Sequence, residues 1–326
     1  MSSSILPSSS LPLIASQVRA YFAPVNRSTG TPTLFDPAVN SAWNTGAPPS
    51  PWIDLGYITE FTRTSESTLL DVYTGVPSTL QIQAKQKIAA SVAFRFASWS
   101  KLAMALASGS QHMNVVAPVS SASAAIASGA KGIAAVALQS SSTGTLLYPS
   151  LSMPSIQAGS LVVVDVDYTT QTGFVGSAVS GGYVPNVAAV GSDPDYVRRI
   201  SFNISRVAAL TSDGGFLLAS PLLAGAPAAS MKMQPVLGFV DREGGSFFQE
   251  WSALFLYEGV QGDKLFLHYP RLQASQGSSE SIVGIASALD MVSPLGRYVA
   301  LPIVDGNDNE QCVCYRTYIP AAVAGA

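Results

Sequence analysis

The chain has 326 residues, of which 48% are hydrophobic and only 11% are charged, and its formal net charge is −3. This charge disfavours sequence-independent nucleic-acid binding, which needs a basic surface. Apolar runs fall well short of the ~18 residues that a membrane-spanning helix requires, so the composition also disfavours a membrane helix.

The first part of the chain is predicted to form strands. A Ser/Pro-rich arm over residues 1–17 leads into an opening strand and turn within 18–35, and a second strand follows over 52–61. The run TRTSESTLLDVYTGVPS, residues 62–78, lacks regular periodicity and is interpreted as a linker. Loops of this length inside a compact domain are usually functional or disordered, so a mobile surface loop is the alternative interpretation.

Residues 80–96, LQIQAKQKIAASVAFRF, alternate between apolar and polar side chains over almost their whole length. Period two is typical of a half-buried strand, yet strands usually span only about five or six residues. The apolar parity includes Leu80, Ile82, Ile88, Val92 and Phe94, and the polar parity includes Gln81, Gln83, Lys85, Lys87, Ser91 and Arg95. The pattern therefore predicts a very long strand with one apolar face and one wet face.

A short helix is expected directly after this strand. Ser98 is suited to cap its N-terminus and Gly109 to end it. Trp99, Leu102, Ala103 and Leu106 recur at helical spacing, which predicts a helix with one apolar stripe.

The middle of the chain is nearly free of charge. Between residues 102 and 192 the only charged residues are Lys131, Asp165 and Asp167. Such a surface is poorly suited to a solvated monomer, so we interpret it as covered by neighbouring subunits rather than as disordered low-complexity sequence. Strand-like runs such as SLVVVDVDYTTQTG favour this interpretation.

From residue 196 onward the sequence again predicts strands. YVRRISFNISRVAAL and MKMQPVLGFVD come first, and SFFQEWSALFLYEG and DKLFLHYPRL are expected to pair as a hairpin around Gly259 and Gly262. CVCYRTYI is expected to be the closing strand. We therefore predict a mainly β fold with a main domain over 18–116 and 196–326, and an insertion or outer domain over 117–195.

The residues that often carry chemistry do not form a recognisable site. His112 follows the expected helix and His268 lies on an expected strand, and neither has a nucleophile or metal partner nearby in sequence. Cys312 and Cys314 are expected on one strand face as buried thiols, because further ligands are missing nearby. The sequence therefore predicts no catalytic residue, no metal site and no cofactor.

Three acidic runs have alternative interpretations. VDGNDNE, residues 304–310, lacks the spacing of a calcium loop and is interpreted as a turn. Asp165 and Asp167 share a strand face, either as a carboxylate pair or, in the preferred interpretation, as a solvated or interface face. DREGG, residues 241–245, suits either a catalytic loop or, preferably, a salt-bridged joint between subunits.

The order of these elements resembles the tail tube, or major tail, proteins of long-tailed bacteriophages. The matching pieces are the Leu55-Gly56 step ending an early strand, the Thr/Ser-rich acidic run 62–75, the long strand 80–96 and the tryptophan-containing helix SWSKLAMALA. DKLFLHYPRLQ is similar, more loosely, to a late strand of these proteins. The resemblance covers about residues 15–115 and parts of 196–320.

This resemblance implies a structural virion protein that assembles with itself. Tail tube subunits form hexameric rings that stack into a hollow tube, through which DNA passes during genome ejection without specific binding. The implied fold is a mainly β, tail-tube-like β-sandwich or barrel with a long amphipathic strand and a flanking short helix, contributing to a multi-subunit β-barrel. Tail-tip, tape-measure and terminator proteins are the implied partners. The implied location is the virion tail, assembled in the host bacterial cytoplasm, and no membrane is involved.

The resemblance also implies roles for individual side chains. The polar parity of the long strand is expected to face the lumen: Gln81, Gln83, Lys85, Lys87, Ser91 and Arg95. The apolar parity is expected to pack beneath the helix in a core of Ile88, Val92, Phe94, Trp99, Leu102 and Leu106. The N-terminal arm and the run 62–78 are expected to join stacked rings, with contacts from Arg63, Glu66, Leu69, Leu70 and Asp71.

Two features differ from the pattern of the family. Family lumens are commonly acidic, whereas Lys85, Lys87 and Arg95 are basic, so either acids on other strands outnumber them or they pair at subunit seams. The chain is also longer than a minimal tube subunit, which favours an insertion over two fused tube domains that build trimeric rings. The alternative function is a capsid decoration or adhesin-like binding module, which does not explain the strand-helix order.

Overall fold

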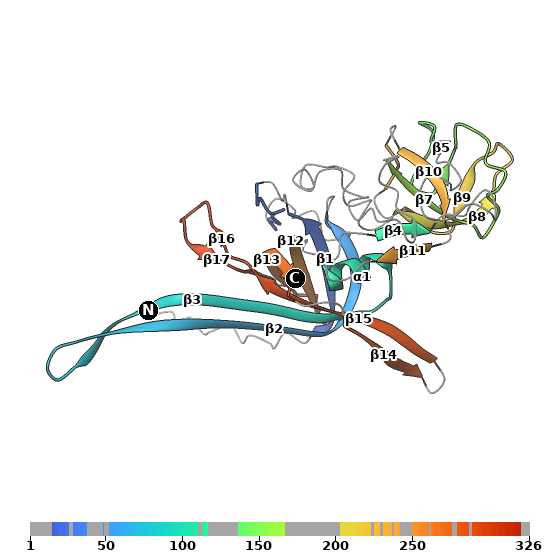
Figure 1. Ribbon diagram of the computed structural model, residues 1–326. Coiled ribbons are helices and arrows are strands. Elements are labelled where there is room, and N and C mark those ends of the chain that lie inside the picture. The colour runs from blue at the N-terminus through green and yellow to red at the C-terminus, as the bar shows by residue number, and fades with distance from the viewer. Residues whose placement is uncertain are drawn as a thin grey trace, which may run out of the picture.

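The computed structural model describes residues 15–25, 29–37, 48, 52–109, 113–116, 136–166, 203–222, 225–228, 231–236, 238–241, 250–260, 262–275, 279–286 and 289–320. This part of the chain is mainly β with one short helix, as the sequence predicts. Its strands form a large sheet, a small sheet and two two-stranded pairs (Figure 1). Among the described residues, no helical segment combines the length and apolar character of a membrane span.

The large sheet contains β1 (Ala15–Pro24), β2 (Ile53–Thr74), β3 (Thr79–Phe96), β12 (Glu250–Gly259), β13 (Lys264–Ala274), β14 (Ser279–Ala286), β15 (Leu289–Ala300) and β18 (Tyr315–Ile319). The small sheet contains β5 (Val136–Ala137), β6 (Leu146–Leu147), β7 (Leu161–Val166), β8 (Ile204–Leu210), β9 (Phe216–Leu218) and β10 (Met231–Val236). The two further pairs are β4 (Met113–Val116) with β11 (Gly238–Asp241), and β16 (Ile303–Val304) with β17 (Gln311–Cys312); helix α1 spans Lys101–Ser108.

The large sheet closes on itself. Its strand order is β14-β15-β3-β2-β1-β12-β13-β18, and the end of β13 also pairs with the end of β15, where Leu272 lies opposite Ala300. The strands from β15 round to β13 therefore form a closed ring, to which β14 and β18 are added outside. Closure matters because unpaired strand edges promote aggregation.

Aromatic side chains fill the interior of the closed sheet. Phe22 of β1 is fully buried and packs edge-on against Phe94 of β3 and Phe255 of β12, with ring centroids 6.0 and 6.1 Å apart. Trp251 and Tyr269 are buried in the same core. The cluster joins strands that are far apart in the sequence. Aromatic residues bury the largest areas of any side chains, so these contacts contribute much of the stability of the closed sheet.

Helix α1 packs on the closed sheet beside β13 and β15. Ser100 caps it by accepting a hydrogen bond from the amide of Ala103 at 3.0 Å, and Gly109 ends it in the left-handed conformation, with φ of 65°. The expected cap, Ser98, is therefore wrong by two residues. Leu102, Ala103 and Leu106 are buried in the core of the closed sheet, which confirms these three residues of the predicted apolar stripe, whereas Trp99 lies before the helix.

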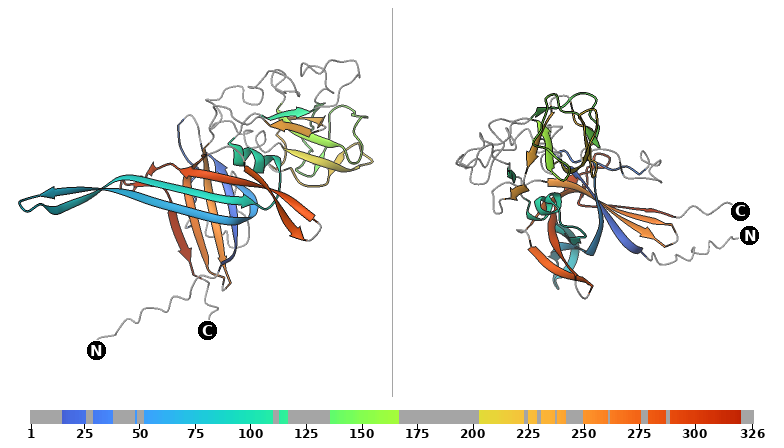
Figure 2. Two further views of the ribbon diagram at one scale, coloured as in Figure 1. Left: turned by 60° about the horizontal axis from the view of Figure 1, so that its bottom comes forward. Right: turned by 90° about the vertical axis from the view of Figure 1, so that its right-hand side faces the viewer.

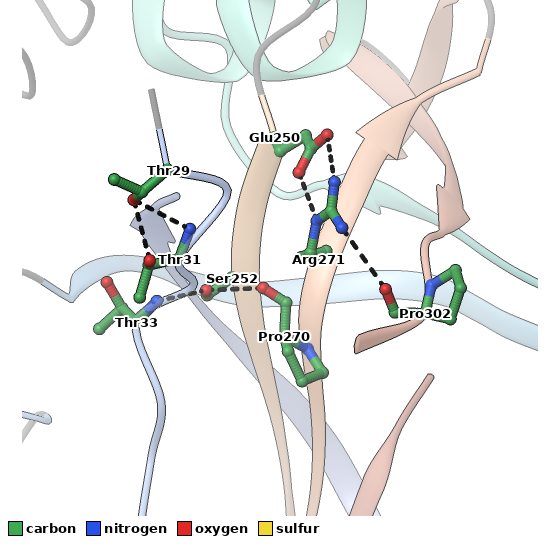
Figure 3. A network of polar contacts seen from close by, with 8 residues as sticks. All are labelled: Thr29, Thr31, Thr33, Glu250, Ser252, Pro270, Arg271 and Pro302. Atoms are coloured by element: carbon green, nitrogen blue, oxygen red, sulfur yellow. Dashed lines mark hydrogen bonds and ion pairs between the residues drawn. The ribbon is translucent and has the colours of Figure 1, made fainter. Parts of the chain in front are cut away.

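A proline in the central strand β13 is accommodated by a bulge. Between two consecutive pairings with β12, strand β13 contains one residue more than its partner, and Pro270 falls in that stretch. Proline cannot donate a ladder hydrogen bond, so it is tolerated where the ladder is interrupted. The hydroxyl of Ser252 donates to the carbonyl of Pro270 at 2.7 Å and accepts from the amide of Thr33 at 3.0 Å (Figure 3). The bulge thereby ties the loop after β1 to the sheet.

An ion pair strengthens the same end of the sheet. Arg271 donates to both carboxylate oxygens of Glu250, at 2.6 and 2.9 Å, and its remaining nitrogen lies 3.5 Å from the carbonyl of Pro302 (Figure 3). This two-pronged geometry is specific to arginine. It fixes β12, β13 and the segment after β15 relative to one another.

The small sheet is an insert between α1 and β12. Its strand order is β5-β10-β7-β8-β9-β6. Strand β4 leads into this region and β11 leads out of it, and the two pair with each other (Figure 1). Because β8, β9 and β10 belong to the small sheet, the insert extends past the expected boundary at residue 195, up to the start of β11.

Strand β7 accounts for part of the charge-poor middle of the chain. Val162 and Val164 are buried with Met231 in the core of the small sheet, whereas Val163 is buried with the core of the closed sheet. A strand that is covered on both faces has a nearly continuous run of apolar residues in its sequence. The chain itself therefore covers part of the surface that the composition assigned to neighbouring subunits.

Candidate assembly surface

Strands β2 and β3 extend beyond the closed sheet as a two-stranded arm, defined here as residues 64–89 (Figure 1, Figure 2). Every residue of the arm is exposed, whereas β3 is alternately buried from Ala90 onward. Each strand of the arm is about 35 Å long at ~3.3 Å per residue. The run 62–78 is therefore the outer half of β2 and its turn, and the prediction of a linker without regular structure is wrong.

The two strands of the arm are offset by two bulges, one at Gln86 and one at Gln81. Thr68 and Leu69 are neighbours in β2, but their partners Lys87 and Lys85 are separated by Gln86. An extra residue in one strand shifts its alternation by one position relative to the other strand. Because paired residues share a face of a sheet, the apolar parity of β3 changes face at Gln86. It changes face again at Gln81, because the neighbours Val72 and Tyr73 pair with Ile82 and Leu80.

The arm consequently presents apolar side chains on both faces. One face carries Leu70, Val72 and Ile82, and the other carries Leu69, Leu80 and Ile88, with exposed fractions between 38% and 62%. The expectation of one apolar and one wet face along the whole strand is therefore wrong. A contiguous group of large, exposed apolar side chains marks an interaction site.

The base of the arm is held by polar contacts as well as by the core. Arg95 of β3 is half-buried and its Nε lies 2.6 Å from Oε2 of Glu60 in β2. The hydroxyls of Thr64 and Ser91 are hydrogen-bonded at 2.6 Å directly across the two strands. These contacts fix the direction in which the arm leaves the closed sheet.

The expected lumen-facing residues are spread over both faces of β3. Five of them are exposed: Gln81, Gln83, Lys85, Lys87 and Ser91. Lys87 pairs with Thr68 and Lys85 with Leu69, so the two lysines lie on opposite faces of the arm. The sixth residue, Arg95, is engaged with Glu60. Their proximity to a lumen stays a prediction.

Four of the six residues expected beneath the helix belong to the core of the closed sheet: Val92, Phe94, Leu102 and Leu106. The other two, Ile88 and Trp99, are 38% and 47% exposed. Ile88 lies in the arm, beyond the end of the core, and Trp99 precedes the helix. Alternation in the sequence predicts the strand, but it does not show where the core beneath that strand ends.

The residues expected to join rings lie on the arm or at its base. Glu66, Leu69, Leu70 and Asp71 are exposed on the arm, and Arg63 is half-buried just before it. Their contact with another ring stays a prediction. Residues 1–14 of the expected N-terminal arm lie outside the described residues, and β1 begins at Ala15, earlier than the expected start of the opening strand.

The structure places the residues that often carry chemistry in two regions: His268 lies on β13 of the closed sheet, and Cys312 and Cys314 lie where β17 leads into β18. His268 is buried between the rings of Trp52 and Tyr315, with centroids 5.8 and 5.9 Å away, and this burial lowers its pKa to about 4. Cys312 ends β17 and Cys314 precedes β18, so the two do not share one strand. Both are half-buried free thiols, and burial raises the pKa of Cys314.

The acidic run 304–310 is a turn, as predicted. Asp305 accepts hydrogen bonds from the backbone amide and the side chain of Asn307, both at 2.9 Å, and from the hydroxyl of Tyr315 at 2.8 Å. These bonds, led by that from the backbone amide, hold the pKa of Asp305 below its ordinary value. Within the described ranges, no three His, Cys, Asp or Glu side chains gather as a metal site.

Several other expected features lie outside the described residues. They are His112, Asp167, Arg242, Glu243, Gly244 and Gly245. The side chains of Asp165 and Asp241 are likewise not described.

The fold and the arm define a mainly β protein with a closed sheet and a large projecting hairpin. Neither a protein-family model nor a curated protein matches the chain. Its function is therefore inferred from its own residues and geometry.

Proposed function

We propose that this protein is a structural subunit that assembles with copies of itself, as a tail tube protein of a long-tailed phage does. The observation that carries the proposal is the arm, which projects from the closed sheet with exposed apolar side chains on both faces. An isolated two-stranded hairpin is marginally stable in water. Contact with further subunits supplies the burial that the described residues do not provide.

The arm offers enough apolar surface to drive association. Covering the exposed half of side chains such as Leu70, Val72 and Ile82 contributes about 1 kcal/mol for each of them. A ring or stack repeats this contact once for every subunit. Many weak apolar contacts then produce a stable assembly, although the chain has few charged residues that could form ion pairs between subunits.

The order of elements supports the tail tube in particular. The long strand β3 belongs to the closed sheet and is followed by helix α1, which packs on that sheet, and this is the strand-helix order of the resemblance. Stacked hexameric or pseudo-hexameric rings, DNA passing through the lumen, and tail-tip, tape-measure and terminator partners are parts of this proposal. So is a location in the virion tail.

Assembly of the purified protein tests the proposal. Negative-stain microscopy and light scattering at rising concentration should show rings and then hollow tubes. A matched control replaces residues 66–89 with Asn-Gly, which joins Ser65 to its direct partner Ala90 through a two-residue hairpin turn. This armless variant should keep the unfolding temperature of the closed sheet and stop at single subunits or small species.

Two outcomes would count against the proposal. A wild-type chain that stays monomeric at high concentration, even with tail-tip or tape-measure proteins as initiators, favours the alternative of a capsid decoration or adhesin-like module. Tubes that form equally well from the armless variant would show that another surface drives assembly.

A further inference from the structure

Among the described strands, both outer edges of the arm are unpaired. Strand β1 pairs with β2 only as far as Ile58, and β15 pairs with β3 only between Ala90 and Arg95. Along the arm itself, the described strands pair only with each other. The outer N–H and C=O groups of both strands therefore form ready templates for a further strand.

The charges of the arm are separated between its two strands. Strand β2 contributes Glu66 and Asp71, and β3 contributes Lys85 and Lys87, so the arm has no net charge. Asp71 accepts a hydrogen bond from the side chain of Gln83 at 2.9 Å. Within the described part of the chain, the four charged groups form no ion pair with one another. One edge of the arm is thus acidic and the other basic.

We propose that arms of neighbouring copies add side by side, with the acidic edge of β2 in one copy against the basic edge of β3 in the next. The inference rests on the proposed self-assembly and specifies its geometry. Because β2 and β3 run antiparallel, identical arms laid side by side in one direction continue the antiparallel order. Pairing β2 with β2, or β3 with β3, places like charges on adjacent strands, which is destabilising.

The register of the hairpin supports this arrangement. Glu66 lies opposite Ala89, two residues from Lys87 on the same face, and Asp71 lies opposite Gln83, two residues from Lys85. When neighbouring arms are level, Glu66 of one copy lies opposite Ala89 of the next and Asp71 lies opposite Gln83, so each carboxylate has a lysine as its diagonal neighbour on the same face, within reach of these long side chains. Each face of the extended sheet then carries one acid–lysine pair for every junction.

This contact is head-to-tail. The surfaces that meet are different, so each added copy leaves one acidic and one basic edge free for the next. Such an interface closes into a ring or continues as a helix, and it cannot end at a symmetric dimer. The arm therefore specifies an assembly with many subunits.

Charge reversal distinguishes this geometry from the alternatives. One variant carries Glu66→Lys and Asp71→Lys, so that both edges are basic, and the other carries Lys85→Glu and Lys87→Glu, so that both are acidic. All four positions are exposed, so both variants should fold, which circular dichroism and the unfolding temperature check. Each variant alone should have a critical concentration for assembly about tenfold or more above that of the wild type.

Two rescue measurements complete the experiment. An equimolar mixture of the two variants should assemble near the wild-type concentration, because the basic edge of one meets the acidic edge of the other. A single chain with all four reversals should also assemble, because its two edges have only exchanged sign. Pairing of acids and lysines within one arm predicts rescue by the fourfold chain but not by the mixture, and that result overturns the inference.

Other results separate this inference from the proposed function. If each reversed variant assembles like the wild type, edge pairing is wrong although self-assembly stands. If the wild type does not assemble, both fail. A monomeric wild type that co-sediments with phosphatidylcholine vesicles, where the armless variant does not, assigns the arm to a lipid surface and likewise overturns both.

Discussion

Phe94 and Tyr298 stack face to face, with ring centroids 5.5 Å apart and ring planes 15° apart. Both side chains are fully buried, and the hydroxyl of Tyr298 donates to the carbonyl of Leu106 at 3.1 Å. The stack joins β3, β15 and helix α1 close to the point where the arm leaves the closed sheet. The same strand β3 thus has a tightly packed base and a fully exposed outer half.

This division predicts opposite effects of substitution at the two ends of β3. Phe94→Ala should lower the free energy of unfolding by about 3–5 kcal/mol, because it leaves a cavity within the aromatic core. Ile82→Ser should change it by less than about 0.5 kcal/mol, because Ile82 is exposed in the single chain. Urea unfolding of the unassembled protein measures both values. Similar losses for the two variants would show that the arm packs on the core in solution.

Ile88 provides a sharper test of where the core ends. The sequence pattern predicts that Ile88→Asp prevents folding, but the side chain is 38% exposed and should tolerate the charge in the single chain. Val92→Asp, four residues further along, buries an unpaired carboxylate and should prevent folding. Soluble expression and circular dichroism distinguish the two variants. The folded Ile88→Asp protein should still fail to assemble, since it places a charge on an apolar part of the arm.

Amide hydrogen exchange should reveal the same boundary without any substitution. In the dilute, unassembled protein, amides within residues 64–89 should exchange rapidly, because the arm opens without disturbing the core. Amides of residues 90–95 should exchange slowly, since this part of β3 lies between β2 and β15. Assembly should slow exchange across the whole arm. Equal protection of both segments in the monomer would contradict a marginally stable arm.

The sequence predicts those elements that carry a regular apolar pattern. Residues 80–96 alternate over almost their whole length, although only the part from Ala90 onward lies over the core, and the helix carries an apolar stripe. The outer half of β2 is not predicted as a strand, because its exposed run TSESTLLDVYT does not alternate. Its threonines, valine and tyrosine favour strands, and this composition was the signal available. The bulge at Gln86 is a property of the pairing between β2 and β3, so it cannot be predicted from the periodicity of β3 alone.

The buried histidine makes the closed sheet sensitive to acid. His268 is only 3% exposed, and its Nε2 has no hydrogen-bond partner among the described residues. Protonation there places an unpaired charge in the core, so burial lowers its pKa from 6.5 to about 4. Between these two values the unfolded chain binds a proton that the folded chain does not.

The free energy of unfolding should therefore fall as the pH drops from 6.5 toward 4, by roughly 3 kcal/mol from this residue. Above pH 6.5 both states are neutral at His268 and the contribution is constant. His268→Phe retains an aromatic ring beside Trp52 and Tyr315 but does not titrate. Urea unfolding of both proteins at pH 7.5 and pH 4.5 separates this effect from that of the carboxyl groups, which titrate in both. The variant should lose markedly less stability in acid than the wild type, and equal losses would show that His268 is solvated or paired in the folded protein.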